Sequence, residues 1–205
     1  QAIAPSETET GQLFGNSIAI SGNKSKAVVG ARSEDLSGFT ADAGAVYFLR
    51  DSNGVWIHDQ KVRASDAEAS DQFGQSVAMS KDGNYAIVGA YLEDENGTNN
   101  GAAYIFRDSS GTWVEEQKLI SGEFFNGGSG ADAPSTSAYF GQSVDISKDG
   151  NYAIVGSQNY AGNSGSLSAS GAAYVFKYDP TTIIVENQAI APSETETGQL
   201  FGNSI

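Results

Sequence analysis

Hydrophobic and polar positions change over short stretches of this chain, and the stretches are too short for helices. Within residues 73–120, Ser76–Ser80 alternates in polarity, whereas Tyr85–Ala90 is continuously apolar. Alternation is typical of a strand buried on one face, and a short apolar run is typical of a strand buried on both. Gly101–Phe106 is a third apolar run, and Thr112–Leu119 is a more polar one. The pattern therefore predicts four short strands in these residues.

Glycine-containing turns separate these runs. Asp82-Gly83 lies between the first two, and Ser110-Gly111 lies between the last two. Glycine supplies the positive φ angle that tight hairpin turns require. Four strands joined in this way form a small antiparallel sheet. One such sheet cannot bury both of its faces, so we expect neighbouring sheets to pack against it.

The whole pattern repeats along the chain. The dipeptide Phe-Gly recurs at spacings of 59, 67 and 61 residues, beginning at Phe14, Phe73, Phe140 and Phe201. The second and third copies share the segments FGQSV, SKDGNYAIVG and GAAY, and the first copy is a looser version. A match of this length, in constant order, predicts a tandem array of similar units.

These residues resemble the FG-GAP repeat family. Its marks here are Phe-Gly opening a strand, Val-Gly-Ala closing the next, and Gly-Ala-Ala-Tyr-Ile-Phe in the third. The trailing Gly111-Thr112-Trp113 and Gln117-Lys118-Leu119 are similar to one branch of the family. That family builds the seven-bladed propeller heads of integrin α subunits and of many bacterial and protist surface proteins. The resemblance implies β-propeller blades and an extracellular or cell-surface location.

The expected fold is therefore all-β, with tandem four-stranded antiparallel propeller blades, three per chain. The expected bounds are 14–72, 73–139 and 140–200, with 1–13 ending the outer strand of a preceding blade and 201–205 starting a next one. Closed propellers have about 4–8 blades, so three are too few for a ring. The blades then belong either to a closed β-propeller or to an open stacked filament.

Integrin-type copies often carry a calcium loop of the DxDxDG kind between the first two strands. The corresponding turns here, Ser80–Asn84 and Ser147–Asn151, each hold one carboxylate. Calcium takes six to eight oxygen ligands, so the family's metal sites are not carried over and no cofactor is expected. The acidic loop Glu93–Asn100 leaves weak calcium binding open, but we favour a solvated connecting loop.

The two ends of the chain share a segment. Residues 1–18 recur unchanged at 188–205, an offset of 187 residues, although the internal copies have diverged. Either the natural protein is a longer array with a 187-residue super-repeat, which we favour, or the overlap was engineered. Gln1–Ile3 and Gln188–Ile190 both continue the outer-strand segment seen at Gln60–Val62. We therefore expect other copies, or adjacent repeats, to be partners through edge strands.

Charge and composition exclude several classes of protein. The chain has 205 residues with Lys+Arg 11 and Asp+Glu 25, and its formal net charge of -14 repels nucleic acid. It has no cysteine, so a disulfide framework or thiolate metal site is impossible. No apolar run reaches the roughly 20 residues of a membrane-spanning helix.

Candidate chemistry is sparse. His58 is the one histidine of the sequence, and we expect it on the surface of an outer strand rather than in a catalytic set. Trp56 and Trp113 occupy matching positions, with Ile184 in the third copy, and we expect them to pack in the core.

Two further groups of residues are possible contact or modification sites. Asn23 and Asn96 begin glycosylation sequons, which matter if the protein is secreted by a eukaryote. Phe124 and Phe125 lie in the long insert Ser121–Tyr139. They either contact a partner or fold back over the blade edge.

Repeats, a duplicated end and the missing catalytic set point to a non-enzymatic extracellular structural or adhesive protein. In this hypothesis the blades stack into a rigid array or filament. The alternative is an integrin-head-like propeller that presents loops to a surface protein or glycan.

Overall fold

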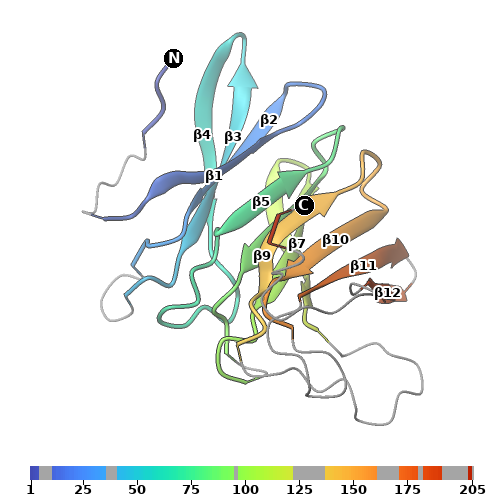
Figure 1. The fold of residues 1–205 in the computed structure, drawn as a ribbon. Helices are drawn as coiled ribbons and strands as arrows, with labels where there is room; N and C mark the ends of the chain where they lie inside the picture. Colours follow the sequence, from blue (N-terminus) through green and yellow to red (C-terminus); the bar gives the residue numbers. More distant parts are fainter. Residues whose placement is uncertain are drawn as a thin grey trace.

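The computed structural model describes residues 1–4, 11–35, 41–94, 97–121, 137–160, 171–179, 182–190 and 203–204. Within these residues, twelve strands form three separate antiparallel sheets, each with four strands in sequence order (Figure 1). This confirms the expected all-β fold of four-stranded blades. In the described part of the chain, no helix is long and apolar enough to cross a membrane.

We refer to the three sheets as blades 1, 2 and 3. Blade 1 consists of β1 (Phe14–Ile20), β2 (Lys26–Ala31), β3 (Ala45–Ser52) and β4 (Val55–Val62). Blade 2 consists of β5 (Ser76–Met79), β6 (Tyr85–Ala90), β7 (Ala102–Ser109) and β8 (Thr112–Leu119). Blade 3 consists of β9 (Phe140–Ile146), β10 (Tyr152–Ser157), β11 (Ala172–Asp179) and β12 (Thr182–Ile190).

The four strands predicted within residues 73–120 are present, and the largest difference is at the end of the third. Strand β7 continues to Ser109, three residues beyond the predicted end at Phe106. It does so because Arg107 and Asp108 stay in the ladder with β8, opposite Val114 and Trp113. The apolar pattern ends earlier because these two residues are polar: Arg107 forms an ion pair with Glu116, and Asp108 forms one with Lys26 of blade 1.

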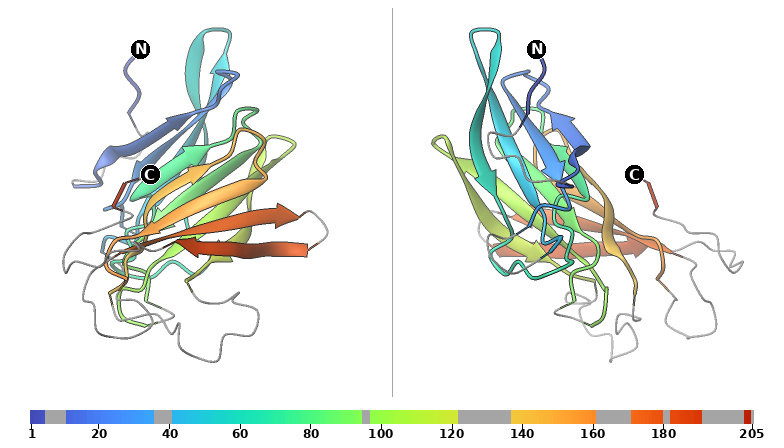
Figure 2. Two further views of the ribbon diagram at one scale, coloured as in Figure 1. Left: turned by 45° about the vertical axis from the view of Figure 1, so that its right-hand side comes forward. Right: turned by 90° about the vertical axis from the view of Figure 1, so that its left-hand side faces the viewer.

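Apolar layers between the blades form the core. Ile87 and Val88, which are adjacent in β6, belong to different layers: Ile87 packs with blade 3 and Val88 with blade 1. The continuously apolar β6 is thus buried on both faces, as predicted. The three sheets stack in chain order as an open fan rather than a closed ring (Figure 2).

Every blade has a β-bulge at the same place. In each one the register between the third and fourth strands shifts next to a glutamine of the outer strand. The pairs at this point are Phe48 with Gln60, Ile105 with Gln117, and Val175 with Gln188. A bulge re-aims the side chains beside it, and this one sets the position of the glutamine contact described below.

Candidate assembly interface

The inner junction between blades is built on glycine. A Cβ atom at Gly89 of β6 would lie 2.0 Å from the carbonyl oxygen of Gly141, and one at Gly30 of β2 would lie 2.2 Å from that of Gly74. No other residue type permits this approach. The Phe-Gly dipeptide of each following blade therefore packs directly on the Val-Gly-Ala strand of the preceding one.

A serine hydroxyl completes this junction. Ser17 of β1 donates a hydrogen bond of 2.7 Å to the carbonyl oxygen of Gly74, and Ser76 of β5 donates one of 2.8 Å to that of Gly141. Both serines come from the same place in the Phe-Gly-x-Ser motif. The glycine of the motif thus contacts the preceding blade, and its serine contacts the following one. These two roles explain why the motif recurs in every blade.

A glutamine joins the outer strands of blades 1 and 2. The side-chain amide of Gln60 donates to the backbone oxygen of Trp113 at 3.0 Å, and the backbone N–H of Trp113 donates to Gln60 Oε1 at 2.8 Å. The indole of Trp113 is 4% exposed and stacks on Phe48, with ring centroids 3.9 Å apart. We call this two-bond contact the glutamine clasp.

Gln1 makes the same clasp to blade 1. Its amide donates to the backbone oxygen of Trp56 at 2.8 Å and accepts from the backbone N–H of Trp56 at 2.9 Å. Gln1 precedes Gln60 by 59 residues, which is also the Phe-Gly spacing between blades 1 and 2. Trp113 confirms the expected core role, whereas Trp56 is only partly buried. Trp56 lies on the face of blade 1 that is turned away from blade 2.

That outward face of blade 1 carries uncovered apolar side chains. Ile18 is 73% exposed and Ile20 is 57% exposed. The matching residues of β9, Val144 and Ile146, are each 7% exposed because they pack into the core between blades 2 and 3. The matching residues of β5, Val77 and Met79, are partly buried in the core between blades 1 and 2. These positions are therefore covered, fully or in part, in both blades that have a preceding blade.

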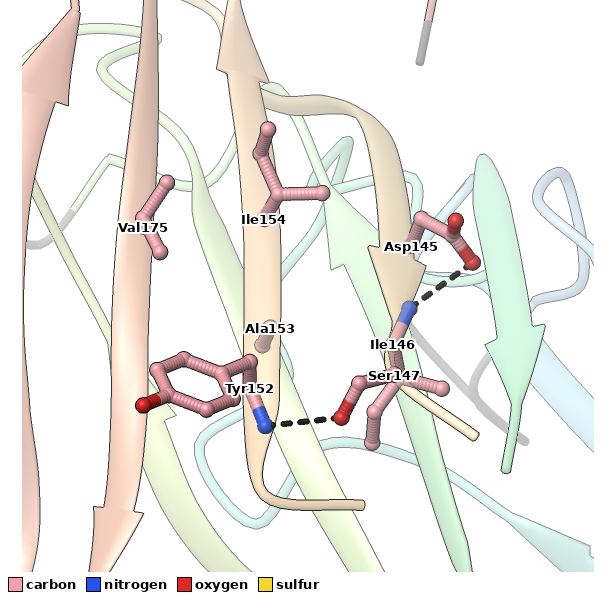
Figure 3. Close-up of a pocket in the computed structure, with 7 residues that line it drawn as sticks. All are labelled: Asp145, Ile146, Ser147, Tyr152, Ala153, Ile154 and Val175. Atoms are coloured by element: carbon pink, nitrogen blue, oxygen red, sulfur yellow. Dashed lines mark hydrogen bonds between the residues drawn. The ribbon is translucent and has the colours of Figure 1, made fainter. Parts of the chain in front are cut away.

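The outward face of blade 3 holds a pocket of about 310 Å³. Ile154 of β10 and Val175 of β11 lie side by side in it, and Asp145 lies at its side on β9 (Figure 3). The matching residues of blade 2, Ile87 and Ile105, pack in the same cluster as Val144 and Ile146. The pocket thus corresponds to the surface of blade 2 that blade 3 covers.

The carboxylates at the predicted turns are engaged within the turns themselves. Asp82 accepts hydrogen bonds from Ser80 Oγ at 2.6 Å and from the backbone N–H of Asn84 at 3.0 Å. Burial opposes ionisation of Asp82, but these hydrogen bonds outweigh it and lower its pKa. Asp149 makes the matching bonds in blade 3. In the described residues, no three potential metal ligands gather in one place.

Asn23, one of the two possible glycosylation sites, occupies the same turn position in blade 1. Its Oδ1 accepts from Ser21 Oγ at 2.7 Å and from the backbone N–H of Ser25 at 3.0 Å. Its amide donates to the backbone oxygen of Asp82 in blade 2 at 2.7 Å. Asn23 therefore ties two blades together, and its modification stays a prediction. Asn96, Phe124 and Phe125 lie outside the described residues.

The expectation of a solvated loop at Glu93–Asn100 was wrong at both of its ends. Glu93 is 5% exposed and Asn100 is 1% exposed. The burial of Glu93 is compensated by Lys118, which supplies a countercharge at 2.9 Å. Asn100 lies against blade 3, where its backbone oxygen accepts from the N–H of Phe140 at 2.8 Å. Asp94 is exposed, as expected.

Asp71 has the most strongly shifted carboxyl pKa in this region. It is 3% exposed, and its Oδ2 accepts from the backbone N–H of Glu68 at 2.6 Å. Burial, together with the negative charges of Glu93, Asp94 and Glu68, raises its pKa to about 6. His58 is exposed on β4, as predicted, with its ring 5.4 Å from that of Tyr47.

Solved structures similar to this chain share its fold at low sequence identity. One is a protein from Bacteroides fragilis provisionally named a 6-phosphogluconolactonase, with a TM-score of 0.51 and 17% identity over 85% of this chain. Another, provisionally named in the same way, comes from Bacteroides uniformis, with a TM-score of 0.51 and 12% identity over 89% of this chain. The chain spans only 38% and 42% of those proteins. At this identity the likeness shows the fold alone.

Sequence comparison identifies the family. A search of curated protein sequences finds no match to the chain. The model of the FG-GAP repeat matches residues 1–49, 56–106 and 130–176, which together make up more than half of the chain. The three matched segments end within the third strands of the blades, β3, β7 and β11, and the second segment also includes most of β4 of blade 1. The chain therefore belongs to the FG-GAP repeat family.

Proposed function

We propose that this chain is a non-enzymatic, extracellular structural or adhesive repeat protein whose blades stack into a rigid array. FG-GAP repeats of this kind resemble those of cell-surface proteins, which supports the location. The observation that carries the proposal is the blade junction. Its glycine contact and serine hydrogen bond occur twice with the same parts, between blades 1 and 2 and between blades 2 and 3.

The outward faces of the stack support an array rather than an isolated domain. Ile18 and Ile20 are exposed on one face, and a pocket floored by Ile154 and Val175 opens on the other. Between blades 2 and 3, the matching positions are buried against each other. Apolar area of this kind contributes roughly 25 cal/mol per Å² when it is covered. A further blade on either face would gain that stabilisation.

The alternative function is a binding module that presents loops to a protein or glycan. The observation in its favour is variation on a constant framework. The connections between second and third strands, at 32–44, 91–101 and 158–171, differ in sequence while the strands they join match. Loops on rigid scaffolds often carry recognition. In this alternative the blades would form part of a closed propeller.

Sedimentation velocity of the full chain over a series of concentrations tests the array. We expect the wild-type chain to associate and Ile18→Asp to abolish association, because a carboxylate would be buried in the contact. Val114→Asp, at an exposed apolar position on β8, is the matched control and should associate like the wild type. A wild-type chain that stays a single species throughout would contradict the array.

Protease treatment of intact producing cells, which should degrade the chain, tests the location.

A further inference from the structure

Gln188 stands in blade 3 where a clasping glutamine stands in blade 1. It lies opposite Val175 at the β-bulge of blade 3, as Gln60 lies opposite Phe48 at the bulge of blade 1. Gln60 clasps the tryptophan of the following blade, Trp113. The backbone of β12 therefore places Gln188 at the register position from which Gln60 forms its clasp to the next blade.

The segment that begins at Gln188 has the same sequence as the segment whose first residue binds blade 1. Residues 188–205 are identical to residues 1–18, and Gln1 is the residue that clasps Trp56. A second segment with the same sequence can form the same two hydrogen bonds to the same tryptophan. Exchanging one segment for the other leaves the clasp chemistry unchanged.

The outward faces of blades 3 and 1 carry residues that match those in contact between neighbouring blades inside the stack. Trp113 stacks on Phe48, and the residue of blade 3 that corresponds to Phe48 is Val175. Trp56, brought onto blade 3, would therefore lie over Val175. Ile18 and Ile20 would cover the pocket of Figure 3, as Val144 and Ile146 cover the matching surface of blade 2.

We propose that blade 3 of one copy of this chain docks on blade 1 of a second copy, with Gln188 taking the place of Gln1 at Trp56. This inference rests on the proposed array and names its partner and its contact. Because the clasp is exchanged for an identical one, the net driving force is the covering of Ile18 and Ile20.

One residue of the docking face opposes this contact. Asp145 is exposed on the face of blade 3, at the position held by Ala19 in blade 1 and Ala78 in blade 2. Ala78 is 8% exposed because blade 3 covers it. Docking would remove water from the Asp145 carboxylate, which weakens the contact. Asp145→Ala is therefore expected to strengthen association of the full chain.

Thiol cross-linking tests the register directly, because the chain has no cysteine and each variant then carries a single thiol. Asn187→Cys leaves Gln188 intact and lies at the bulge position where, in blade 2, Glu116 is 3.4 Å from Tyr178 of the next blade. It is mixed with Val55→Cys, next to Trp56, and joined by a short bismaleimide. Thr112→Cys, next to Trp113, is the matched control, because Gln60 already holds that tryptophan.

We expect a link between positions 187 and 55 and little between 187 and 112. Adding Gln188→Ala to the Asn187→Cys chain should weaken docking about tenfold, the effect of losing two hydrogen bonds. Equal links to 55 and 112 would overturn the docking register. Wild-type association that Ile18→Asp abolishes, with no link to 55, would overturn the inference and leave the array standing. The absence of any association would overturn the proposed function itself.

Discussion

Single polar side chains close the turns between the strands of each blade. Asp82 and Asp149 each accept hydrogen bonds from the serine before and the asparagine after them. Asn23 does so in blade 1 with two serines. An amide and a carboxylate thus serve the same turn, because both offer an oxygen to a hydroxyl and a backbone N–H.

This equivalence predicts the outcome of two substitutions at the turn of blade 2. Asp82→Ala removes an acceptor from Ser80 and Asn84 and should lower the free energy of unfolding by about 1–3 kcal/mol. Asp82→Asn keeps an acceptor oxygen and should cost clearly less. Urea denaturation of both variants measures the difference. Equal losses would show that charge, rather than the acceptor, stabilises the turn.

Asp71 gives the stability of the protein a pH dependence. Its pKa rises from 3.8 to about 6 on folding, so the folded state holds its proton more tightly than the unfolded state. The stabilisation is complete below pH 3.8 and is lost as the pH rises through about 6. The melting temperature of Asp71→Asn, compared with wild type from pH 5 to 7.5, should lack this fall.

A neighbouring variant separates the causes of this shift. Asp94→Asn removes one of the negative charges that raise the pKa of Asp71 but leaves its burial intact. The fall in melting temperature should then move to lower pH without disappearing. A fall that persists unchanged in Asp71→Asn would assign the pH dependence to another group.

At the scale of elements, the blades are separate sheets joined by side-chain contacts and by single backbone hydrogen bonds. The three sheets share no strand ladder, and the inner junction depends on glycines that let the backbones approach. The outer junction between blades 1 and 2 includes one glutamine. Trp113 is held there by the clasp of Gln60 and by stacking on Phe48. Blades 1 and 2 are thus joined at the inner glycine junction, at the turn through Asn23 and at the outer clasp.

The clasp between blades 1 and 2 should be measurable in the stability of the full chain. Gln60→Ala removes two hydrogen bonds and leaves the backbone groups of Trp113 partly buried without these partners. We expect a loss of about 1–3 kcal/mol in urea denaturation. Gln1→Ala removes the same two bonds at the exposed Trp56 clasp and should cost less, because water can replace them. A larger loss for Gln1→Ala would contradict this account of the clasp.

At the scale of the whole molecule, a strong negative charge opposes the association that the apolar faces favour. The formal net charge is -14, so two copies repel each other as they approach. The contact that we propose between them is largely apolar, and salt does not weaken such contacts. Ionic strength therefore acts mainly on the repulsion.

Association of the full chain should therefore increase with salt. The Debye length falls from roughly 30 Å at 0.01 M to roughly 8 Å at 0.15 M ionic strength, which screens the repulsion between copies. Sedimentation velocity at these two ionic strengths should show larger species at the higher one. Weaker association at the higher ionic strength would indicate that ion pairs, rather than apolar faces, hold the copies together.

The sequence by itself determined the strands, the repeat and the family, because these depend on local patterns. The apolar run Tyr85–Ala90 and the turn at Asp82-Gly83 can be read over a few residues, and recurrence of the pattern identifies the array. The single carboxylate of each turn can also be read in the chain, which is why no calcium loop was expected there.

Only the tertiary structure decided which parts of the blades meet. The clasp joins Gln60 and Trp113, which are 53 residues apart, and its geometry arises from a bulge and from the stacking of twisted sheets. Neither leaves a local pattern. The burial of Glu93 likewise depends on Lys118 reaching it from another strand. Contacts between blades are set by packing, so their residues emerge only when the blades are placed side by side.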